Sequence, residues 1–311
     1  MVKKSNTIDT TIILPVVFHI INQNPYNITN TTIINAINDL NNAFGKSGSY
    51  NGSTGVDTKI RFCLAQVAPD GGITDGINRV VSTYGDNLNM FTEDDRLKKL
   101  AQWDPSRYIN VWLVNNIIGE ISADFSCDTW TRLNAGGYAT LPPGGGPSDG
   151  IVISGFGSLF AHEMGHYLGL YHTFEGFCSN NNCETDGDRV CDTPPDGFPN
   201  YTLACSNPTG MNSCSTDTLS NYSNGYFPRD TADFSLNFMD YGNGSCANQF
   251  TFGQAIRMRT AINTQRKGLL ENKCNKPCND NILASFTRNN AIPKTGDLIS
   301  FTNTSTGASS F

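Results

Sequence analysis

The stretch AHEMGHYLGLYHTF, residues 161–174, holds three of the chain's four histidines. Positions i and i+4 of a helix lie on one face, so His162 and His166 point the same way and can hold one metal ion. Glu163 follows the first histidine and would lie beside that ion, as a general base toward a metal-activated water. The stretch therefore predicts a helix that carries a hydrolytic metal site.

Gly169 and His172 extend the pattern to His-Glu-x-x-His-x-x-Gly-x-x-His. A glycine three residues after His166 can adopt the left-handed conformation that ends a helix. The chain then turns, and His172 can reach the same ion as His162 and His166. Catalytic zinc takes three protein ligands and keeps one position open, so the motif predicts a zinc site.

The segment LNFMDYG, residues 236–242, adds a second feature. The eleven-residue motif is the signature of the metzincins, which also place a methionine turn under the metal. Met239 lies 67 residues after His172 and precedes Tyr241 by two positions, so it is the predicted turn methionine. The alternative is an ordinary buried methionine, which is the commoner role of this residue.

Further stretches resemble the pappalysin family of metzincin zinc metalloproteases, of the secreted bacterial type. They are GYAT before a Pro/Gly loop, DGIVI, DTPPD, and NFMDY followed by a cysteine. The resemblance runs from about residue 11 to 270. It implies an α+β metzincin fold, in which an α/β upper subdomain has a twisted, mostly parallel sheet with a backing helix and an active-site helix. An irregular, disulfide-rich lower subdomain would carry the Met-turn.

This resemblance also implies a domain organisation. Residues 1–10 would be an N-terminal tail and 11–273 the catalytic domain, with its upper subdomain at 11–172 and its lower one at 173–273. Residues 274–311 are expected to form a linker and the first strands of an incomplete PKD-like β-module.

The resemblance assigns roles residue by residue. Glu163 would be the general base, and Tyr241 would lie near the zinc and stabilise the oxyanion, unless it is a packing tyrosine. An edge strand would bind the substrate backbone, and a turn-rich loop would hold structural calcium through oxygen ligands. The expected substrate-binding residues are Gly137, Tyr138, Ala139 and Thr140, and the expected calcium ligands are Asp188, Asp192 and Thr193. An ordinary edge strand and solvated turn acids are the alternatives.

One position departs from the family pattern. Family members that prefer a basic residue after the scissile bond have an acidic side chain next to the cysteine that follows the Met-turn. Here Ser245 precedes Cys246, so the sequence does not predict a preference for Arg or Lys. Asp240 is not expected to replace the missing charge, because the family pattern has an acid there in any case.

Composition limits the class of protein. The net charge of −7 argues against nucleic acid as a partner, and no apolar run reaches the roughly 20 residues that span a bilayer. Ten cysteines predict disulfides and an oxidising compartment, with reduced cytosolic thiols as the alternative. The expectation is a secreted or cell-surface monomer whose signal peptide lies outside this sequence, acting on protein or peptide substrates.

Periodicity predicts the secondary structure. Strands are expected at 12–21, 59–67, 108–116, 137–141 and 149–153, and helices at 31–44, 92–103 and 251–270. Thr31 or Thr32 is the expected N-cap of the first helix, and Thr92 with Asp95 the expected capping box of the second. The alternation of strands and helices favours a mostly parallel sheet.

The leading hypothesis is a secreted zinc endopeptidase. Another metzincin branch would use the same chemistry, whereas a non-catalytic adhesin or binding module would keep only the scaffold. The intact Glu163 counts against such a module, because losing the base is the simple route to inactivity. A structural zinc site would need a fourth protein ligand, and Cys178, six residues past His172, is the candidate.

Overall fold

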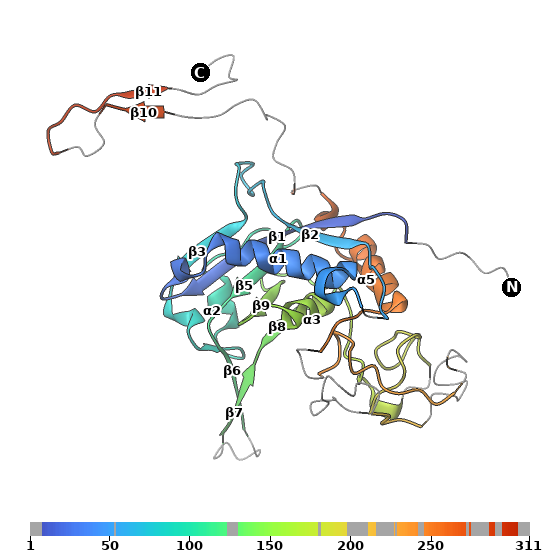
Figure 1. Cartoon of the computed structure of the whole chain (residues 1–311). Coiled ribbons are helices and arrows are strands. Elements are labelled where there is room, and N and C mark those ends of the chain that lie inside the picture. The colour runs from blue at the N-terminus through green and yellow to red at the C-terminus, as the bar shows by residue number, and fades with distance from the viewer. Residues whose placement is uncertain are drawn as a thin grey trace. The chain divides into compact units, whose positions relative to one another are not determined.

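The computed structural model in Figure 1 describes most of the chain. The described residues are 8–52, 54–122, 130–179, 182–197, 211–215, 227, 229–241, 246–271, 274, 286–289 and 294–303. They divide into two units, Met1–Cys274 and Asn275–Phe311, and the first unit carries the histidine motif. In the second unit the described residues form a two-stranded antiparallel pair, β10 (Phe286–Arg288) with β11 (Phe301–Asn303). The PKD-like assignment of this segment stays a prediction.

A six-stranded sheet forms the centre of the first unit (Figure 1). Its path runs β2-β1-β5-β9-β8, and β3 also pairs with β1. All pairs are parallel except β8 with β9, so the predicted mostly parallel sheet is confirmed. The strands are β1 (Ile12–Asn22), β2 (Ile60–Leu64), β3 (Ile77–Val81), β5 (Ile109–Leu113), β8 (Gly137–Ala139) and β9 (Ile151–Ile153). β8 ends the path, so the predicted edge strand is in place.

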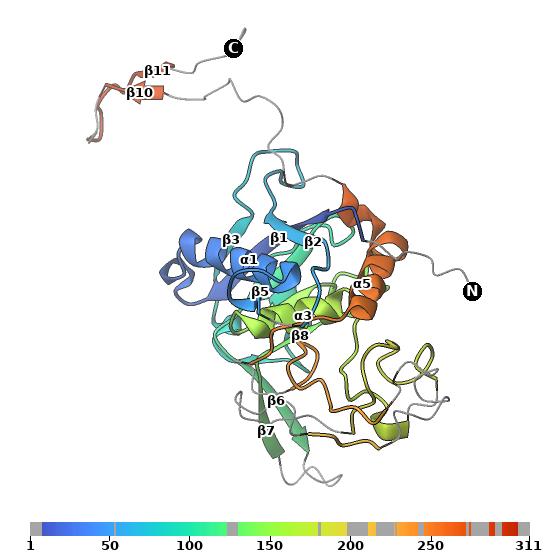
Figure 2. The same cartoon turned by 45° about the vertical axis from the view of Figure 1, so that its right-hand side comes forward.

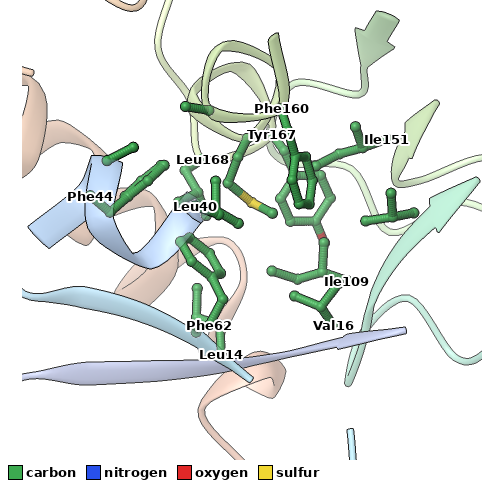
Figure 3. Packing of buried hydrophobic residues seen from close by; sticks show 14 of the residues in the cluster. Leu14, Val16, Leu40, Phe44, Phe62, Ile109, Ile151, Phe160, Tyr167 and Leu168 are labelled. Carbon is green, nitrogen blue, oxygen red and sulfur yellow. The ribbon is translucent and has the colours of Figure 1, made fainter. Parts of the chain in front are cut away.

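Two helices pack on one face of this sheet, as Figures 1 and 2 show. They are α1 (Asn30–Gly45) and α3 (Ser158–Tyr167), the helix that carries the histidine motif. Alternate residues of β1 point toward them because successive side chains of a strand face opposite ways. Figure 3 shows Leu14 and Val16 of β1 in one cluster with Leu40 of α1 and Phe160 of α3. This shared apolar core fixes α3 against the sheet.

The opposite face of the sheet carries a smaller cluster. Trp112 of β5 and Val152 of β9 are fully buried there with Leu97 of the short helix α2 (Asp94–Lys98). A second sheet, β4-β6-β7, continues from this side. Its strands are β4 (Leu88–Asn89), β6 (Ile117–Ser122) and β7 (Trp130–Ala135). β7 leads through Gly136 directly into β8, so this hairpin adjoins the edge strand.

The described residues between 173 and 250 contain little regular structure beyond the short 3-10 turn Phe177–Ser179, in keeping with the weak periodicity of this stretch. Disulfides Cys178–Cys214 and Cys183–Cys191 cross-link this region, and Cys246 is disulfide-bonded as well. Cys63–Cys274 ties β2 to the end of the unit. Because Cys178 is bonded to Cys214, it is not a free thiolate, and the predicted alternative of Cys178 as a fourth zinc ligand is wrong.

The helix α5 (Phe252–Thr264) closes the first unit, followed by a 3-10 turn at Lys267–Leu270. The predicted helix at 251–270 therefore ends six residues early. Thr251 caps it in a capping box with Gln254. Gln254 and Met258 are on its buried face, while Ile256 is 39% exposed. The remaining 3-10 turns lie at Pro25–Asn27, Gly48–Tyr50 and Thr83–Gly85.

Two predicted helix starts are wrong. Helix α1 begins after Thr29, whose hydroxyl accepts a bond from the Thr32 amide, so neither Thr31 nor Thr32 is the N-cap. Helix α2 is only five residues long, and its N-cap Glu93 makes no side-chain capping bond. The predicted box of Thr92 and Asp95 does not form, because Thr92 lies in a turn in which its amide donates to Asn89 Oδ1 and the Glu93 amide donates to the Asn89 carbonyl. Among the described residues, no helix has the length and apolar character needed to cross a membrane.

Candidate metal centre

The motif helix ends where the sequence predicts. Gly169 has φ +99°, the left-handed region, and its amide donates to the His166 carbonyl at 2.8 Å. The Leu170 amide donates to the Gly165 carbonyl at 2.9 Å. These two bonds form a Schellman motif, which satisfies the last carbonyls of the helix and reverses the chain. The reversal brings His172 back beside α3.

The three predicted zinc ligands converge on one point. Nε2 of His166 lies 3.0 Å from Nε2 of His162 and 3.0 Å from Nε2 of His172. In the described part of the chain, this is the one cluster of three or more His, Cys, Asp or Glu side chains with metal-ligand spacing. Nitrogen ligands about 2.05 Å from a tetrahedral zinc lie roughly 3.3 Å apart, close to the spacing found here.

Backbone carbonyls orient two of these rings. Nδ1 of His162 lies 2.6 Å from the Phe238 carbonyl, and Nδ1 of His166 lies 2.9 Å from the Leu170 carbonyl. A carbonyl only accepts hydrogen bonds, so each Nδ1 carries the proton and each Nε2 presents a lone pair. Lone pairs that meet this closely repel unless a cation lies between them. The residues present therefore fit a zinc ion.

Electrostatics agrees with this assignment. Burial, reinforced by the neighbouring His166, lowers the pKa of His162 to about 3. Burial, reinforced by the two other histidines, lowers the pKa of His172 to about 3, and burial lowers the pKa of His166. All three imidazoles are therefore neutral at pH 7, the form that binds metal.

Glu163 is buried beside the triad, with 5% of its surface exposed. Burial raises the pKa of its carboxyl to about 8, and no hydrogen bond or ion pair contributes to that shift. A cation in the triad would lower this pKa again by favouring the carboxylate. A carboxyl group whose pKa lies near neutrality suits proton transfer in both directions.

The edge strand β8 contacts Glu163 directly. An ideal Cβ on Gly137 would lie 2.8 Å from Glu163 Cγ and 3.0 Å from its Oε1. A Cβ on Gly136 would lie 2.9 Å from Leu159 Cδ1, one turn earlier on α3. Neither position has room for a side chain, so these glycines let the strand approach the helix. From the sequence, Gly137 was predicted only to bind substrate. Its contact with Glu163 could not be predicted.

The predicted turn methionine lies beneath α3. Met239 is fully buried, and a Cβ on Gly165 would lie 2.5 Å from its sulfur. The Met239 amide donates to Asn237 Oδ1 at 3.0 Å, and its carbonyl accepts from the Thr173 amide at 3.1 Å. Asn237 also exchanges two side-chain hydrogen bonds of 2.9 Å with Gln254, which ties the turn to α5.

Aromatic rings surround the open side of the triad. The Tyr241 ring centroid lies 4.5 Å from that of His172 and 5.5 Å from that of His162. Phe174 stacks on His172 at 4.6 Å with an interplanar angle of 8°. Tyr241 remains 38% exposed, so its side chain is accessible from solvent. The sequence reasoning missed Phe174, although it stands two residues after the last histidine of the motif.

A cavity of about 550 Å³ adjoins His162. Its wall consists of the Gly136–Gly137 backbone, Leu159 of α3 and the Met-turn residues Phe238 and Tyr241, among others. A larger cavity of about 820 Å³ lies between α5 and the loop that contains Arg189 and Asp192, and no triad residue lines it. Of these two cavities, the smaller one therefore adjoins the metal centre.

The three predicted calcium ligands do not all point to one place. Asp188 is buried and accepts from the Thr193 hydroxyl at 2.7 Å and from the Val190 amide at 3.0 Å. Burial raises its pKa to about 8. Asp192 instead accepts from the Thr251 hydroxyl at 2.6 Å and from the Gly253 amide at 2.7 Å, at the start of α5. Ser245, which bears on residue preference, lies outside the described residues.

Comparison with known proteins agrees with this geometry. The sequence model of the Peptidase_M43 family, described as Pregnancy-associated plasma protein-A, matches residues 91–263, which are 173 of the 311 residues. An extracellular metalloprotease of Sordaria macrospora is 29% identical over 232 residues, 71% of this chain and 70% of that protein. Extracellular metalloprotease 1 of Coccidioides posadasii is 39% identical over 112 residues, 36% of this chain and 33% of that protein.

Solved structures give the same picture. Mature mirolysin of Tannerella forsythia in complex with a cleaved peptide has a TM-score of 0.63 and 26% identity. The match covers 86% of this chain and 99% of that one. Mirolysin in complex with a compound matches with the same score and identity, over 86% of this chain and 100% of that one.

Proposed function

The chain belongs to the Peptidase_M43, or pappalysin, family of metalloproteases, and we propose that it is a secreted zinc endopeptidase with Glu163 as general base. One observation carries the proposal. Three neutral histidines direct Nε2 atoms at one point, and a buried carboxyl group stands next to them. Secretion is supported by the disulfides and by relatives named as extracellular.

His162, His166 and His172 would hold the zinc ion. When bound, zinc supplies Lewis-acid chemistry: it lowers the pKa of water and polarises the carbonyl group of the scissile bond. The histidines contribute neutral ligands, and the carbonyls of Phe238 and Leu170 fix the orientation of two of them. Such outer bonds set the tautomer and the direction of each ligand.

Glu163 moves the proton. Its carboxylate accepts a proton from the attacking water, whose oxygen bonds to the carbonyl carbon, and then gives that proton to the amine nitrogen as the C–N bond breaks. Burial supports both steps, because it raises the pKa of the carboxyl group and so opposes the lowering that the cation causes. Gly137 supports the same role by letting β8 approach within contact of this side chain.

Tyr241 and β8 act on the substrate. The phenol of Tyr241 stands against two triad rings and is accessible, which suits a donor to the oxygen that gains negative charge. Residues 137–140 form or adjoin the free edge of the sheet, where an extended peptide can add as another strand. Met239 packs beneath α3 and supports the helix that presents His162 and His166.

We also propose structural calcium in the loop around Asp188. A buried carboxyl group with a raised pKa is a group that a cation would stabilise in its charged form. The hydrogen bonds of Asp192 to α5 leave Asp188 and Thr193 as the better ligands of the three. Calcium should raise the Tm of the wild-type protein and of Asp192→Asn, but not that of Asp188→Asn. An equal rise in Tm for all three proteins would show that Asp188 is not a calcium ligand.

The function is tested by cleavage of denatured casein. The wild-type protein should cleave it, a chelator should abolish cleavage, and stoichiometric zinc should restore it. Glu163→Ala should lose activity by several orders of magnitude while it binds one zinc per chain. Glu271→Ala is the matched control, because it removes an exposed carboxylate from a surface ion pair with Arg107. A folded, zinc-loaded wild type without activity would instead favour the adhesin or binding-module alternative.

A further inference from the structure

We propose that the cavity of about 820 Å³ between α5 and the loop around Arg189 binds an organic carboxylate with an apolar body. The carboxylate group would lie between the guanidinium groups of Arg189 and Arg257, and the apolar body would lie against α5. Neither a triad histidine nor Glu163 lines this cavity, so the proposal does not depend on peptidase activity.

The two arginines meet at the ring of Tyr171. The guanidinium carbon of Arg189 lies 5.2 Å from the centroid of that ring, and the guanidinium carbon of Arg257 lies 5.0 Å from it. Both distances are within the roughly 6 Å over which an aromatic ring attracts a cation. All three side chains line the cavity, so one tyrosine holds two positive charges at the same wall.

The surrounding fold sets the position of each arginine. Arg257 belongs to α5, and its Nε donates to the Gly169 carbonyl at 2.7 Å, at the turn that follows α3. Arg189 is exposed, whereas Asp188 and Val190 on either side of it are buried. The buried neighbours anchor the loop and leave the Arg189 side chain at the surface. Two segments that are far apart in the sequence therefore build the positive wall.

Neither positive charge forms an ion pair with a described carboxylate. The ion pairs among the described residues include neither Arg189 nor Arg257. Asp188 interacts with Arg257 only at longer range, and Asp188 and Asp192 both direct their carboxylates to hydrogen bonds within the chain. Burial lowers the pKa of Arg257, and the charge of Arg189 lowers it further. An anion between the two guanidinium groups would offset that repulsion and accept charge-assisted hydrogen bonds.

Much of the remaining wall is apolar. Its apolar side chains include Leu141, Pro142, Val190, Phe252 and Ile256. Leu141 is 37% exposed and Ile256 is 39% exposed, so water reaches two large hydrophobic side chains here. A hydrocarbon body that covers them removes apolar surface from water, which is favourable. A small inorganic anion would leave this surface wet, so the wall favours a carboxylate that carries an apolar body.

Titration calorimetry of the full-length, zinc-loaded protein at constant ionic strength tests the site. Octanoate represents a free organic acid, and acetyl-Leu-Leu with a free C-terminus represents the end of a peptide. The carboxylate that binds more tightly identifies the source of the ligand. It should exceed its own amide in affinity by at least about 10-fold, because the amide lacks the negative charge. Acetate should bind at least about 10-fold more weakly than octanoate, because it cannot cover the apolar wall.

Two variants change the charge of the wall. Arg189→Met keeps a long side chain at an exposed position and should weaken binding of the tighter carboxylate about 10-fold. Glu184→Gln should strengthen that binding about 2-fold, because Glu184 is exposed at the same cavity and its charge repels an anion. Arg96→Met is the matched control and should bind as the wild type does, because Arg96 is also exposed but does not line the cavity.

Three results would overturn the proposal. The first is that neither carboxylate binds, or that neither binds more tightly than its amide. The second is binding that Arg189→Met leaves unchanged and zinc removal abolishes, because the carboxylate would then be a ligand of the metal. The third is equal weakening by Arg189→Met and Arg96→Met, which would be an effect of net charge. Because the readout is binding, a wild type without casein cleavage would reject the proposed function and leave this site in place.

Discussion

Gly137 and Glu163 are in contact across the boundary between the edge strand and the motif helix, with no space between them for a methyl group. The strand proposed to bind substrate is thereby set at a fixed distance from the carboxyl group proposed to move the proton. Both elements also belong to the same buried core, through β9 on one side and Phe160 on the other. The contact between β8 and α3 therefore sets both the proposed position of the substrate backbone and the position of Glu163.

Gly137→Ala should lower kcat about 100-fold, because its methyl group would lie 2.8 Å from Glu163 Cγ and displace the base or the strand. The zinc content and circular dichroism spectrum should stay unchanged. Gly146→Ala is the control, since a Cβ there meets nothing within 4 Å. Full activity of Gly137→Ala in steady-state kinetics would show that the contact does not position Glu163.

Arg266→Met should cost about 3–5 kcal/mol of unfolding free energy, measured by chemical denaturation. Arg266 makes a bidentate pair with Asp149, at 2.7 and 3.0 Å, and both side chains are buried. Its loss leaves the Asp149 charge unpaired. Arg107→Met removes the exposed pair with Glu271 and should change the free energy of unfolding far less, because water screens that pair. Equal costs at the two sites would contradict the account.

Acid should destabilise the protein partly through His19. Burial lowers its folded pKa to about 4, despite the hydrogen bond with Asn110. Its unfolded pKa is about 6.5, so between pH 6.5 and 4 the unfolded state binds more protons. The contribution of neutral His19 to the free energy of unfolding is fully present above pH 6.5. It decreases as the pH drops, by about 3 kcal/mol at most. Equilibrium unfolding of His19→Gln should show a correspondingly smaller loss, and parallel curves would refute the assignment.

Replacing both cysteines of Cys178–Cys214 with serine should destabilise the irregular region more than the same change at Cys183–Cys191. The first bond closes 36 residues and the second closes eight. Chain entropy gives about 4 kcal/mol for the longer loop and about 2.5 kcal/mol for the shorter one. Limited proteolysis within residues 173–250 and thermal unfolding would show which double variant is less stable. A lower stability of the Cys183–Cys191 variant would contradict this explanation.

The convergence of the three histidines could be predicted from sequence because its determinants are local. One helical turn fixes His162 against His166, and Gly169 takes the left-handed conformation that the motif requires. The parallel sheet followed from apolar strands alternating with helices. In both cases, the residues that determine the structure lie within a few positions of one another, so the sequence pattern reveals them.

Long-range relationships could not be predicted in this way. Asp149 and Arg266 are 117 positions apart, and neither residue type signals the other. The contact of Gly137 with Glu163 depends on how β8 packs on α3. The hairpin of β6 and β7 was also missed, and α2 ends at Lys98, five residues before the end of the predicted helix. Tertiary packing overrode local propensity at each of these places.

The most direct test of the central claim is mass spectrometry of a proteome-derived peptide library after incubation with the wild-type protein or with Glu163→Ala. The samples are zinc-loaded, chelated, or chelated and then resupplied with zinc. New peptide termini are expected with the zinc-loaded and resupplied wild type alone. Equal cleavage by zinc-loaded Glu163→Ala, or cleavage by the wild type that survives chelation, would contradict this expectation.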